Sequence, residues 1–353
     1  MRLLFNKILF LSILMLIGCS KSEDDAGQIN DNTPAITSVE IFVSSGEVII
    51  GTTVLFTAFD NTGKNRTNEA KFYINDSEIS GSSHTFNEEG TYQVYAKLQN
   101  FKSQTEEISV NPVPIEYKQY VLVEDYTGTW CGYCTRVSYA IEEVKKQTND
   151  AVIIAIHQGD PMQFSQVSSL MSTFQYLQGQ NQSGFPFPSA FINRSVKWSF
   201  PEPNNISQVT AKLSKKSYAA LAMESSLDGD ILTIKVKLKM GYNYKALKLG
   251  LYILEDGIKY DQKNWTSYYT GDPLKNYEHN DVLRKSVTGL LGDQIPTDKV
   301  GHDKEFVREF QYAIPRQYKK DNIKMVAFVT EASKKETINV RVSKIGETQT
   351  FEK

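Results

Sequence analysis

VLVEDYTGTWCGYCTR, residues 121–136, sets two cysteines between a hydrophobic run and an amphipathic segment. The apolar residues that begin this stretch are typical of a buried strand, and Thr-Gly-Thr at 127–129 is typical of a turn. After Cys134, apolar residues recur every three or four positions from 137 to 144, which predicts a helix with one face on a sheet. The stretch therefore predicts a strand, a turn and a helix, with a dithiol where the helix begins.

The spacing of the two cysteines suits redox chemistry. Residues three apart on a first helical turn share one face, so Cys131 and Cys134 are close enough to close a small disulfide ring. Unpaired N–H groups and the helix dipole favour a thiolate on Cys131 and lower its pKa below the free value of ~8.5. We expect Cys131 to be the nucleophile and Cys134 the resolving thiol.

Residues around the dithiol resemble two known groups of proteins. Trp130 directly before the first cysteine, and Asp125 at the position of a buried carboxylate, resemble the thioredoxin superfamily. The segments EDYTGTWCGYC, GDPM, FPSAFINR and YEHNDVLR resemble the outer membrane protein 28 family of Gram-negative lipoproteins. The resemblance runs from about Tyr117 to the C-terminus. It implies a thioredoxin-like fold and no particular substrate.

The same resemblance implies a cis-proline opposite the dithiol, at the start of a strand. Pro188, followed by Ser-Ala-Phe-Ile-Asn, fits that position, and Pro186 is the competing candidate. A cis bond there would present the backbone of Phe187 beside Cys131, where an extended substrate could pair as an added strand.

Other interpretations of the CxxC pair are a metal site and a structural disulfide. A tetrahedral zinc site needs four ligands, the chain has no second CxxC, and only His157 is a plausible neighbour, so no metal is expected. His157 follows the predicted strand at 151–156, at the carboxyl end of the sheet, where ligands bind in open α/β sheets. It is either part of the site or a hydrogen-bonded loop histidine.

The first residues predict a lipid anchor. Arg2 and Lys7 flank a short N-terminal region. A ten-residue apolar stretch follows at 8–17 and is too short to span a bilayer. Leu-Ile-Gly-Cys at 16–19 then has the form of a lipoprotein cleavage site. Residues 1–18 are thus a predicted signal peptide and Cys19 the acylated residue. The alternative is an uncleaved anchor or an ordinary secretory signal.

The predicted location outside the cytoplasm is consistent with the cysteine count. With Cys19 lipidated, Cys131 and Cys134 remain the only thiols, in a compartment that permits disulfides. Ser20 after the lipidated cysteine favours the outer membrane, by analogy with lipoprotein sorting. The periplasmic and external faces both remain open.

Composition is that of ordinary globular domains. The chain has 353 residues, 40% of them hydrophobic and 23% charged, with a net charge of −2. No strongly basic face is implied, so nucleic acid is not an expected partner.

The predicted fold class is an α/β thioredoxin-like central domain flanked by an N-terminal immunoglobulin-like β-sandwich and a C-terminal β-sandwich domain. Short strands between 36 and 110, one of them alternating from 91 to 98, predict the first sandwich, and clear alternation from 232 to 240 predicts the second. The aromatic-rich stretch 265–296 is expected to be a long loop, either functional or packed over the sandwich edge. The expected divisions are a signal peptide at 1–18, a lipidated tether at 19–35, and domains at 36–112, 113–218 and 219–353.

Together these features predict a thiol-disulfide oxidoreductase of the cell envelope, with reduction or isomerisation favoured over oxidation. Asp125 would exchange a proton with Cys134, with Glu124 as the alternate if the strand register shifts by one. The predicted substrate-binding residues are Trp130, Tyr133, Phe187, Pro188 and His157.

The predicted partners are envelope proteins that carry thiols or disulfides, besides the membrane that holds the Cys19 lipid, and no cofactor is expected. The rival hypothesis is a non-enzymatic surface lipoprotein, a binding or adhesion module whose disulfide is structural.

Overall fold

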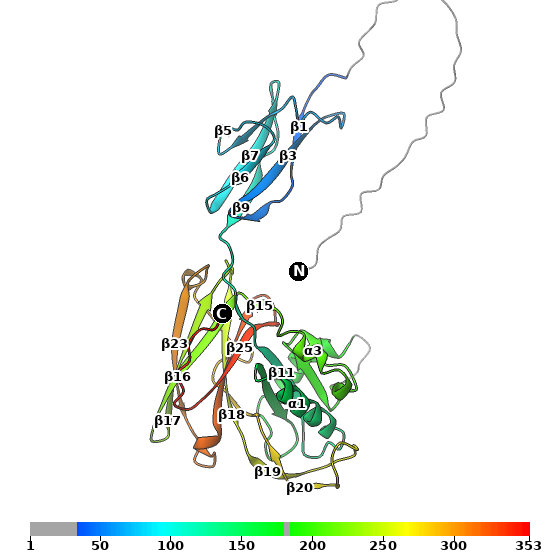
Figure 1. Ribbon diagram of the computed structural model, residues 1–353, viewed down its shortest axis with the longest axis vertical. Coiled ribbons are helices and arrows are strands. Elements are labelled where there is room, and N and C mark those ends of the chain that lie inside the picture. The colour runs from blue at the N-terminus through cyan, green and yellow to red at the C-terminus, as the bar shows by residue number, and fades with distance from the viewer. Residues whose placement is uncertain (1–33, 180–183) are drawn as a thin grey trace, which may run out of the picture.

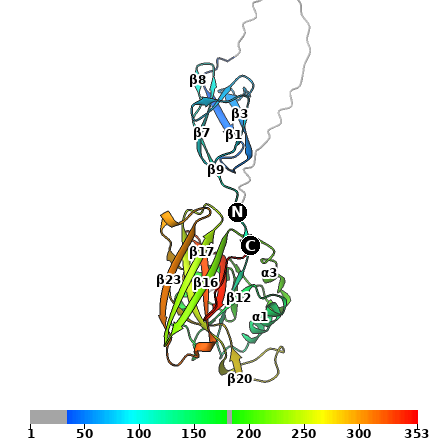
Figure 2. The same ribbon diagram turned by 60° about the vertical axis from the view of Figure 1, so that its left-hand side comes forward.

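The computed structural model describes residues 34–179 and 184–353, in which strands far outnumber helices (Figure 1). A slim N-terminal unit stands at one end of a larger body, and both views show the two parts joined by a short linker (Figures 1 and 2). In that linker, the Ile115 N–H donates to the Gly241 carbonyl over 2.8 Å, and His302 Nε2 lies 3.0 Å from the Val113 carbonyl oxygen.

The N-terminal unit is a β-sandwich of two sheets. One sheet has the order β1-β3-β6, and the other the order β2-β9-β7-β4-β5 with β8 beside β7. Alternation along the strands builds the core, since Val54, Phe56 and Ala58 of β3 are buried. The strands are β1 (Val39–Val43), β2 (Glu47–Ile49), β3 (Thr52–Asp60), β4 (Lys71–Ile74), β5 (Ser77–Glu78), β6 (Ser83–Phe86), β7 (Gly90–Leu98), β8 (Phe101–Lys102) and β9 (Glu106–Asn111).

A nine-stranded sheet organises the larger body. Its order is β14-β13-β11-β12-β21-β18-β24-β25, with β22 beside β18. β11 and β12 are parallel, as predicted from the sequence. On its other edge β12 pairs with β21, also in parallel, through Ala155 and Val282. The strands are β11 (Val121–Thr127), β12 (Ala151–His157), β13 (Ser189–Ile192), β14 (Val196–Lys197), β18 (Leu247–Glu255), β21 (Val282–Ser286), β22 (Asp293–Gln294), β24 (Ile323–Glu331) and β25 (Thr337–Lys344).

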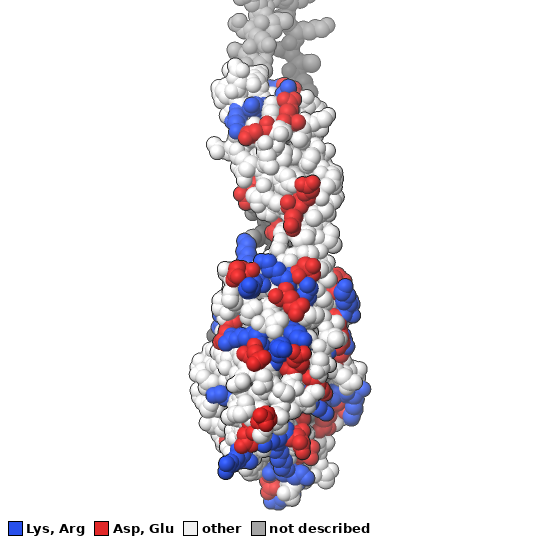
Figure 3. Space-filling model, turned by 90° about the vertical axis from the view of Figure 1, so that its left-hand side faces the viewer, with Lys and Arg blue, Asp and Glu red and all other residues white. Residues whose placement is uncertain are grey.

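A second sheet packs against the C-terminal half of the first. It contains β16 (Ala219–Asp228), β17 (Ile231–Met240) and β23 (Glu305–Ala313), all antiparallel. The predicted alternation of 232–240 is confirmed, because the apolar residues from Leu232 to Met240 are buried in one core with β18 and β24. On the outer face Glu224 pairs with Lys235 and Lys237, and Figure 3 shows charges of both signs interspersed there.

Helices cover opposite faces of the nine-stranded sheet at its N-terminal half. α1 (Thr135–Gln147) buries Val137, Ala140 and Val144 against one face, and α2 (Val167–Phe174) buries Leu170 and Phe174 against the other. The remaining elements are η1 (Gln175–Gln178), η2 (Glu202–Asn204), α3 (Ser207–Thr210), η3 (Thr297–Lys299), η4 (Lys320–Asn322), and the two-stranded pairs β10 (Tyr117–Lys118) with β15 (Lys216–Ser217) and β19 (Ile258–Gln262) with β20 (Leu274–His279).

The predicted fold class is wrong. The chain is mostly β, and the expected central α/β thioredoxin-like domain does not form a sheet of its own, because β12 pairs with β21 and the sheet continues through β18, β24 and β25. The physical reason lies in β18 and β24, whose residues are buried on both faces. Strands of this kind need cover on both sides and partners on both edges. The expected long loop at 265–296 is also wrong, since β20 and β21 lie within it.

Candidate functional site

The disulfide between Cys131 and Cys134 lies in the dithiol loop, residues 128–134, which leads from β11 into α1. Its S–S distance is 2.09 Å and the two Cα atoms lie 5.4 Å apart. Cys134 directly precedes the first residue of α1, and the first turn of this helix carries no acidic side chain. The positive end of the helix dipole therefore acts on the sulfur atoms without a neutralising carboxylate in that turn. Both cysteines are buried, with 5% and 1% of their surface exposed.

Asp125 lies inside the body on the α1 side of β11. Its Oδ1 atom is buried and, among the described residues, has no hydrogen-bond partner. Burial and, to a smaller extent, the Glu202 carboxylate raise the pKa of Asp125 to about 8, although the Arg136 guanidinium opposes the shift. The carboxyl group is thus largely protonated at pH 7.

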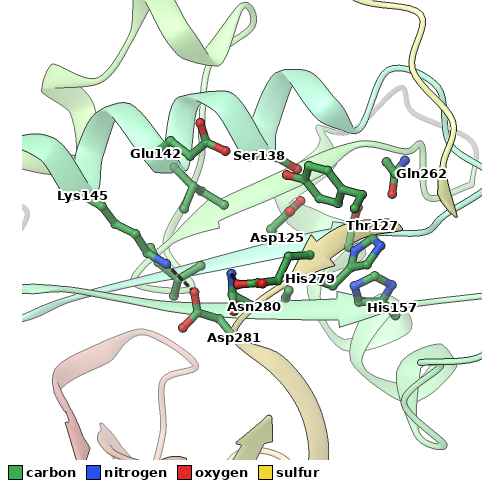
Figure 4. A pocket seen from close by; sticks show the side chains of 15 residues that line it. Asp125, Thr127, Ser138, Glu142, Lys145, His157, Gln262, His279, Asn280 and Asp281 are labelled. Carbon is green, nitrogen blue, oxygen red and sulfur yellow. Dashed lines mark hydrogen bonds and ion pairs between the residues drawn. The ribbon is translucent and has the colours of Figure 1, made fainter. Parts of the chain in front are cut away.

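A polar cavity of about 100 Å³ connects Asp125 with α1 and the β19–β20 hairpin (Figure 4). Ser138, one helical turn after Cys134, lines it together with Asp125, while neither cysteine does. His279 also lines it, and burial, together with the nearby His157, lowers the pKa of His279 to about 4. A space of this size accommodates a few water molecules.

Glu124 lies on the opposite face of β11 from Asp125, as alternation along a strand requires. Its Oε1 atom is 2.6 Å from Nη2 of Arg194, and both side chains are fully buried. The Arg194 guanidinium lies 4.3 Å from the centroid of the Phe328 ring and also donates to the Tyr252 hydroxyl. This ion pair occupies Glu124, which leaves Asp125 as the acid on the dithiol side.

The Phe187–Pro188 peptide bond is cis, and the bond before Pro186 is not. Pro188 directly precedes β13, whose Ser189 pairs with Tyr126 of β11, so Phe187 lies at the sheet end where the dithiol loop begins. Its ring centroid is 5.4 Å from that of Trp130. The structure therefore brings Pro188, Phe187 and Trp130 together.

Two of the predicted substrate-binding residues are exposed beside the disulfide. Trp130 is 46% exposed and Tyr133 is 53% exposed. The Trp130 indole N–H donates to the Gln158 carbonyl over 2.7 Å, which fixes the ring position. Large apolar side chains that are held in place yet open to solvent are suited to contact a partner.

His157 is buried, in contrast to these exposed rings. Its Nδ1 atom is 2.7 Å from the Asp160 carboxylate, and its ring lies 5.2 Å from that of His279. It lines the cavity that also contains Asp125. Contact with a substrate remains a prediction for this residue.

Sequence reasoning missed the part of the site that comes from the β19–β20 hairpin. The Lys263 N–H donates to the Thr129 carbonyl over 2.9 Å, and the Trp265 N–H donates to the Gly132 carbonyl over 2.8 Å. The buried Gln262 amide donates to the Cys131 carbonyl over 3.1 Å. The signal in the sequence was the density of aromatic residues after 264, which gave no indication of what they contact.

The described residues, 34–179 and 184–353, contain no group of three or more His, Cys, Asp or Glu side chains that could hold a metal ion. Within the same ranges no helix is long and apolar enough to cross a membrane. Cys19, the predicted lipid attachment site, lies outside the described residues.

The C-terminal half of the chain is similar to a known protein family. Residues 175–349 match the outer membrane protein Omp28 family. The Omp28 match confirms the predicted outer-membrane location. It spans β13 to β25 and begins after Cys131 and Cys134, so the disulfide itself lies outside the matched residues.

Among the solved structures that are similar to the chain are two proteins of Porphyromonas gingivalis. HBP35 of Porphyromonas gingivalis is 19% identical, with a TM-score of 0.51 over 66% of this chain and 77% of HBP35, which shows a shared fold. A domain of the outer membrane lipoprotein Omp28 from Porphyromonas gingivalis is 21% identical over 38% of this chain and 92% of that domain, with a TM-score of 0.25. No curated protein sequence matches the chain.

Proposed function

We propose that the Cys131–Cys134 pair exchanges thiols and disulfides with other envelope proteins. The observation that carries this proposal is a disulfide at the amino end of α1, flanked by exposed aromatic side chains. A helix start without acidic residues stabilises a thiolate there, and a thiolate is the reactive form of cysteine.

In the direction of reduction, the Cys131 thiolate attacks a substrate disulfide and forms a mixed disulfide, and the first substrate sulfur leaves as a thiolate. Cys134 then loses its proton to Asp125 in the fraction of molecules in which this carboxyl group is ionised, and attacks the Cys131 sulfur. The Cys131–Cys134 bond forms, and the second substrate sulfur leaves. The two electrons gained by the substrate come from the protein dithiol, which a thiol donor of the envelope must reduce again.

The neighbouring residues supply a surface for the substrate backbone. Among the described residues no hydrogen bond involves the backbone N–H or C=O of Phe187, so both groups are available to an extended chain. Trp130 and Tyr133 would give that chain apolar contacts, and Pro188 would keep the Phe187 backbone turned toward it.

A redox titration tests the proposal. The purified protein is equilibrated in a series of glutathione buffers, and free thiols are labelled and counted by mass spectrometry. We expect half-reduction at a potential well above −300 mV, the value below which structural disulfides typically lie. A bond that stays closed at about −300 mV would contradict thiol–disulfide exchange as the function.

Replacing Asp125 with asparagine tests the proton acceptor. The pKa of Asp125 is about 8 in the folded protein, whereas the ordinary value for an aspartate is 3.8, so between these pH values the folded state retains a proton that the unfolded chain has lost. Wild-type stability therefore falls as the pH rises from about 4 to about 8, and Asp125→Asn removes this fall. We expect the variant to gain melting temperature over the wild type at pH 8 and little at pH 4.

The same variant should slow closure of the disulfide by Cys134, on the order of 100-fold, because it removes the proton acceptor. Stopped-flow tryptophan fluorescence during oxidation of the reduced protein gives this rate. The matched control is Asp298→Asn at an exposed site, for which the same rate is expected as in the wild type. An unchanged rate in Asp125→Asn would remove Asp125 from the mechanism.

A second candidate is a non-enzymatic surface protein that binds a partner and keeps its disulfide closed. The comparisons support this candidate better than the first, because they point to outer membrane proteins and bring no evidence of redox activity. The small exposure of both cysteines and the hairpin bound to their loop favour it as well. It predicts that the disulfide resists the glutathione series.

A further inference from the structure

The loop of the β19–β20 hairpin brings an aromatic side chain to the disulfide from a distant part of the sequence. We propose that Trp265 determines specificity, by selecting substrates that carry an apolar side chain next to the reacting cysteine. This inference rests on the proposed thiol–disulfide exchange and names the class of substrate for that site.

Hydrogen bonds hold the hairpin loop against the dithiol loop along its length. Besides the bonds from Lys263 and Trp265 to the backbone of residues 129 and 132, the Thr135 hydroxyl donates to the Asn264 side chain over 2.9 Å and lies 3.0 Å from the Thr266 hydroxyl. Trp265 is thus anchored from both sides, and its position relative to Cys131 is set before any substrate arrives.

Gly132 allows the indole to lie directly on the backbone next to Cys131. A Cβ atom at this position would lie 2.3 Å from Cδ2 of Trp265 and 2.5 Å from its Cγ, which is closer than any real contact. The glycine between the cysteines therefore leaves room for the Trp265 ring rather than for a side chain of its own.

The outer part of the Trp265 side chain is open to solvent, and the Lys263 ammonium group lies 5.2 Å from the centroid of its ring. Trp265 is 55% exposed, and its ring forms an edge-to-face pair with the exposed Tyr133 at 5.4 Å. Trp130 and Phe187 form the other aromatic pair of the site, also at 5.4 Å. A tryptophan with only a structural role would bury most of its surface, whereas this one keeps more than half of it open. A substrate side chain that covers it would gain apolar burial at no cost in ordering the loop.

Exchange kinetics with matched substrates test this role. Reduced protein is mixed with a peptide disulfide that has phenylalanine beside the cysteine, with the same peptide carrying serine there, and with oxidised glutathione. For Trp265→Ala we expect kcat/KM to fall about tenfold for the phenylalanine peptide and less than about twofold for the other two. Trp265→Phe should restore most of the loss, because a large aromatic ring is kept.

Tyr260→Ala is the matched control, since Tyr260 is an aromatic residue of β19 that is 42% exposed, and among the described residues its side chain forms no hydrogen bond or ring contact with the dithiol loop. It should leave all three rates unchanged. An equal loss for all three substrates in Trp265→Ala would mean that Trp265 only supports the loop, and the specificity role would be wrong. A wild-type protein that exchanges with none of the three would instead overturn the proposed function.

Discussion

Replacing Arg194 with methionine is expected to destabilise the larger body by about 3–5 kcal/mol. Arg194 and Glu124 are both fully buried and lie 2.6 Å apart, and Oε2 of Glu124 already lacks a hydrogen-bond partner among the described residues. Removing the guanidinium leaves a carboxylate in an apolar core without its counter-charge. Urea unfolding followed by tryptophan fluorescence measures this effect, because Trp130, Trp198 and Trp265 all lie in the larger body.

The double variant Glu124→Met with Arg194→Met separates charge from packing. If the lost counter-charge is the cause, removing both charges should recover most of the stability that the single variant loses, since a buried pair replaced by apolar side chains is often neutral. Equal losses in the single and the double variant would show that the stacking of Arg194 on Phe328 dominates, in contradiction to this explanation.

Replacing Cys134 with serine is expected to convert the protein into a covalent trap. Cys131 can still attack a peptide disulfide, but no second thiol remains to resolve the mixed disulfide, so the adduct should accumulate to near completion. Intact-protein mass spectrometry after incubation with a disulfide-linked peptide detects it. The wild type, reduced beforehand, should show the peptide released and the Cys131–Cys134 bond closed again.

Cys131→Ser is the matched control, because it removes the same disulfide. The closed loop is short, so each variant should lose about 2 kcal/mol of stability by the chain-entropy estimate, and the two should unfold alike. The two variants should differ only in their reactivity toward the peptide disulfide, because Cys134→Ser keeps the nucleophile and Cys131→Ser removes it. Adducts of equal yield in both variants would contradict the assignment of Cys131 as the nucleophile.

Local features of the site followed directly from the sequence. The parallel pair β11 and β12, the helix after Cys134 and the strand at 231–240 have strong apolar periodicities, and each formed as predicted. The resemblance to known families indicated the cis bond before Pro188, and the structure contains it.

Contacts between residues far apart in the sequence could not be predicted in the same way. The partner of Glu124 lies 70 residues away, and the bond from Trp265 to Gly132 joins residues 133 positions apart, so neither produces a local pattern. For a related reason the sequence did not show that one sheet includes strands from both sides of residue 218, where a domain boundary was predicted. A run buried on both faces, such as β18, shows that a strand is central without showing which strands flank it.

The position of the β19–β20 hairpin determines from which end of the molecule a partner can approach the disulfide. The hairpin lies at the end of the larger body farthest from the N-terminal β-sandwich, in both orientations of the ribbon (Figures 1 and 2). A macromolecule that approaches the disulfide from this end meets neither the sandwich nor the linker. Under the proposed function the N-terminal β-sandwich would act as a spacer, and deleting residues 36–112 would change how far from the bilayer partners are met.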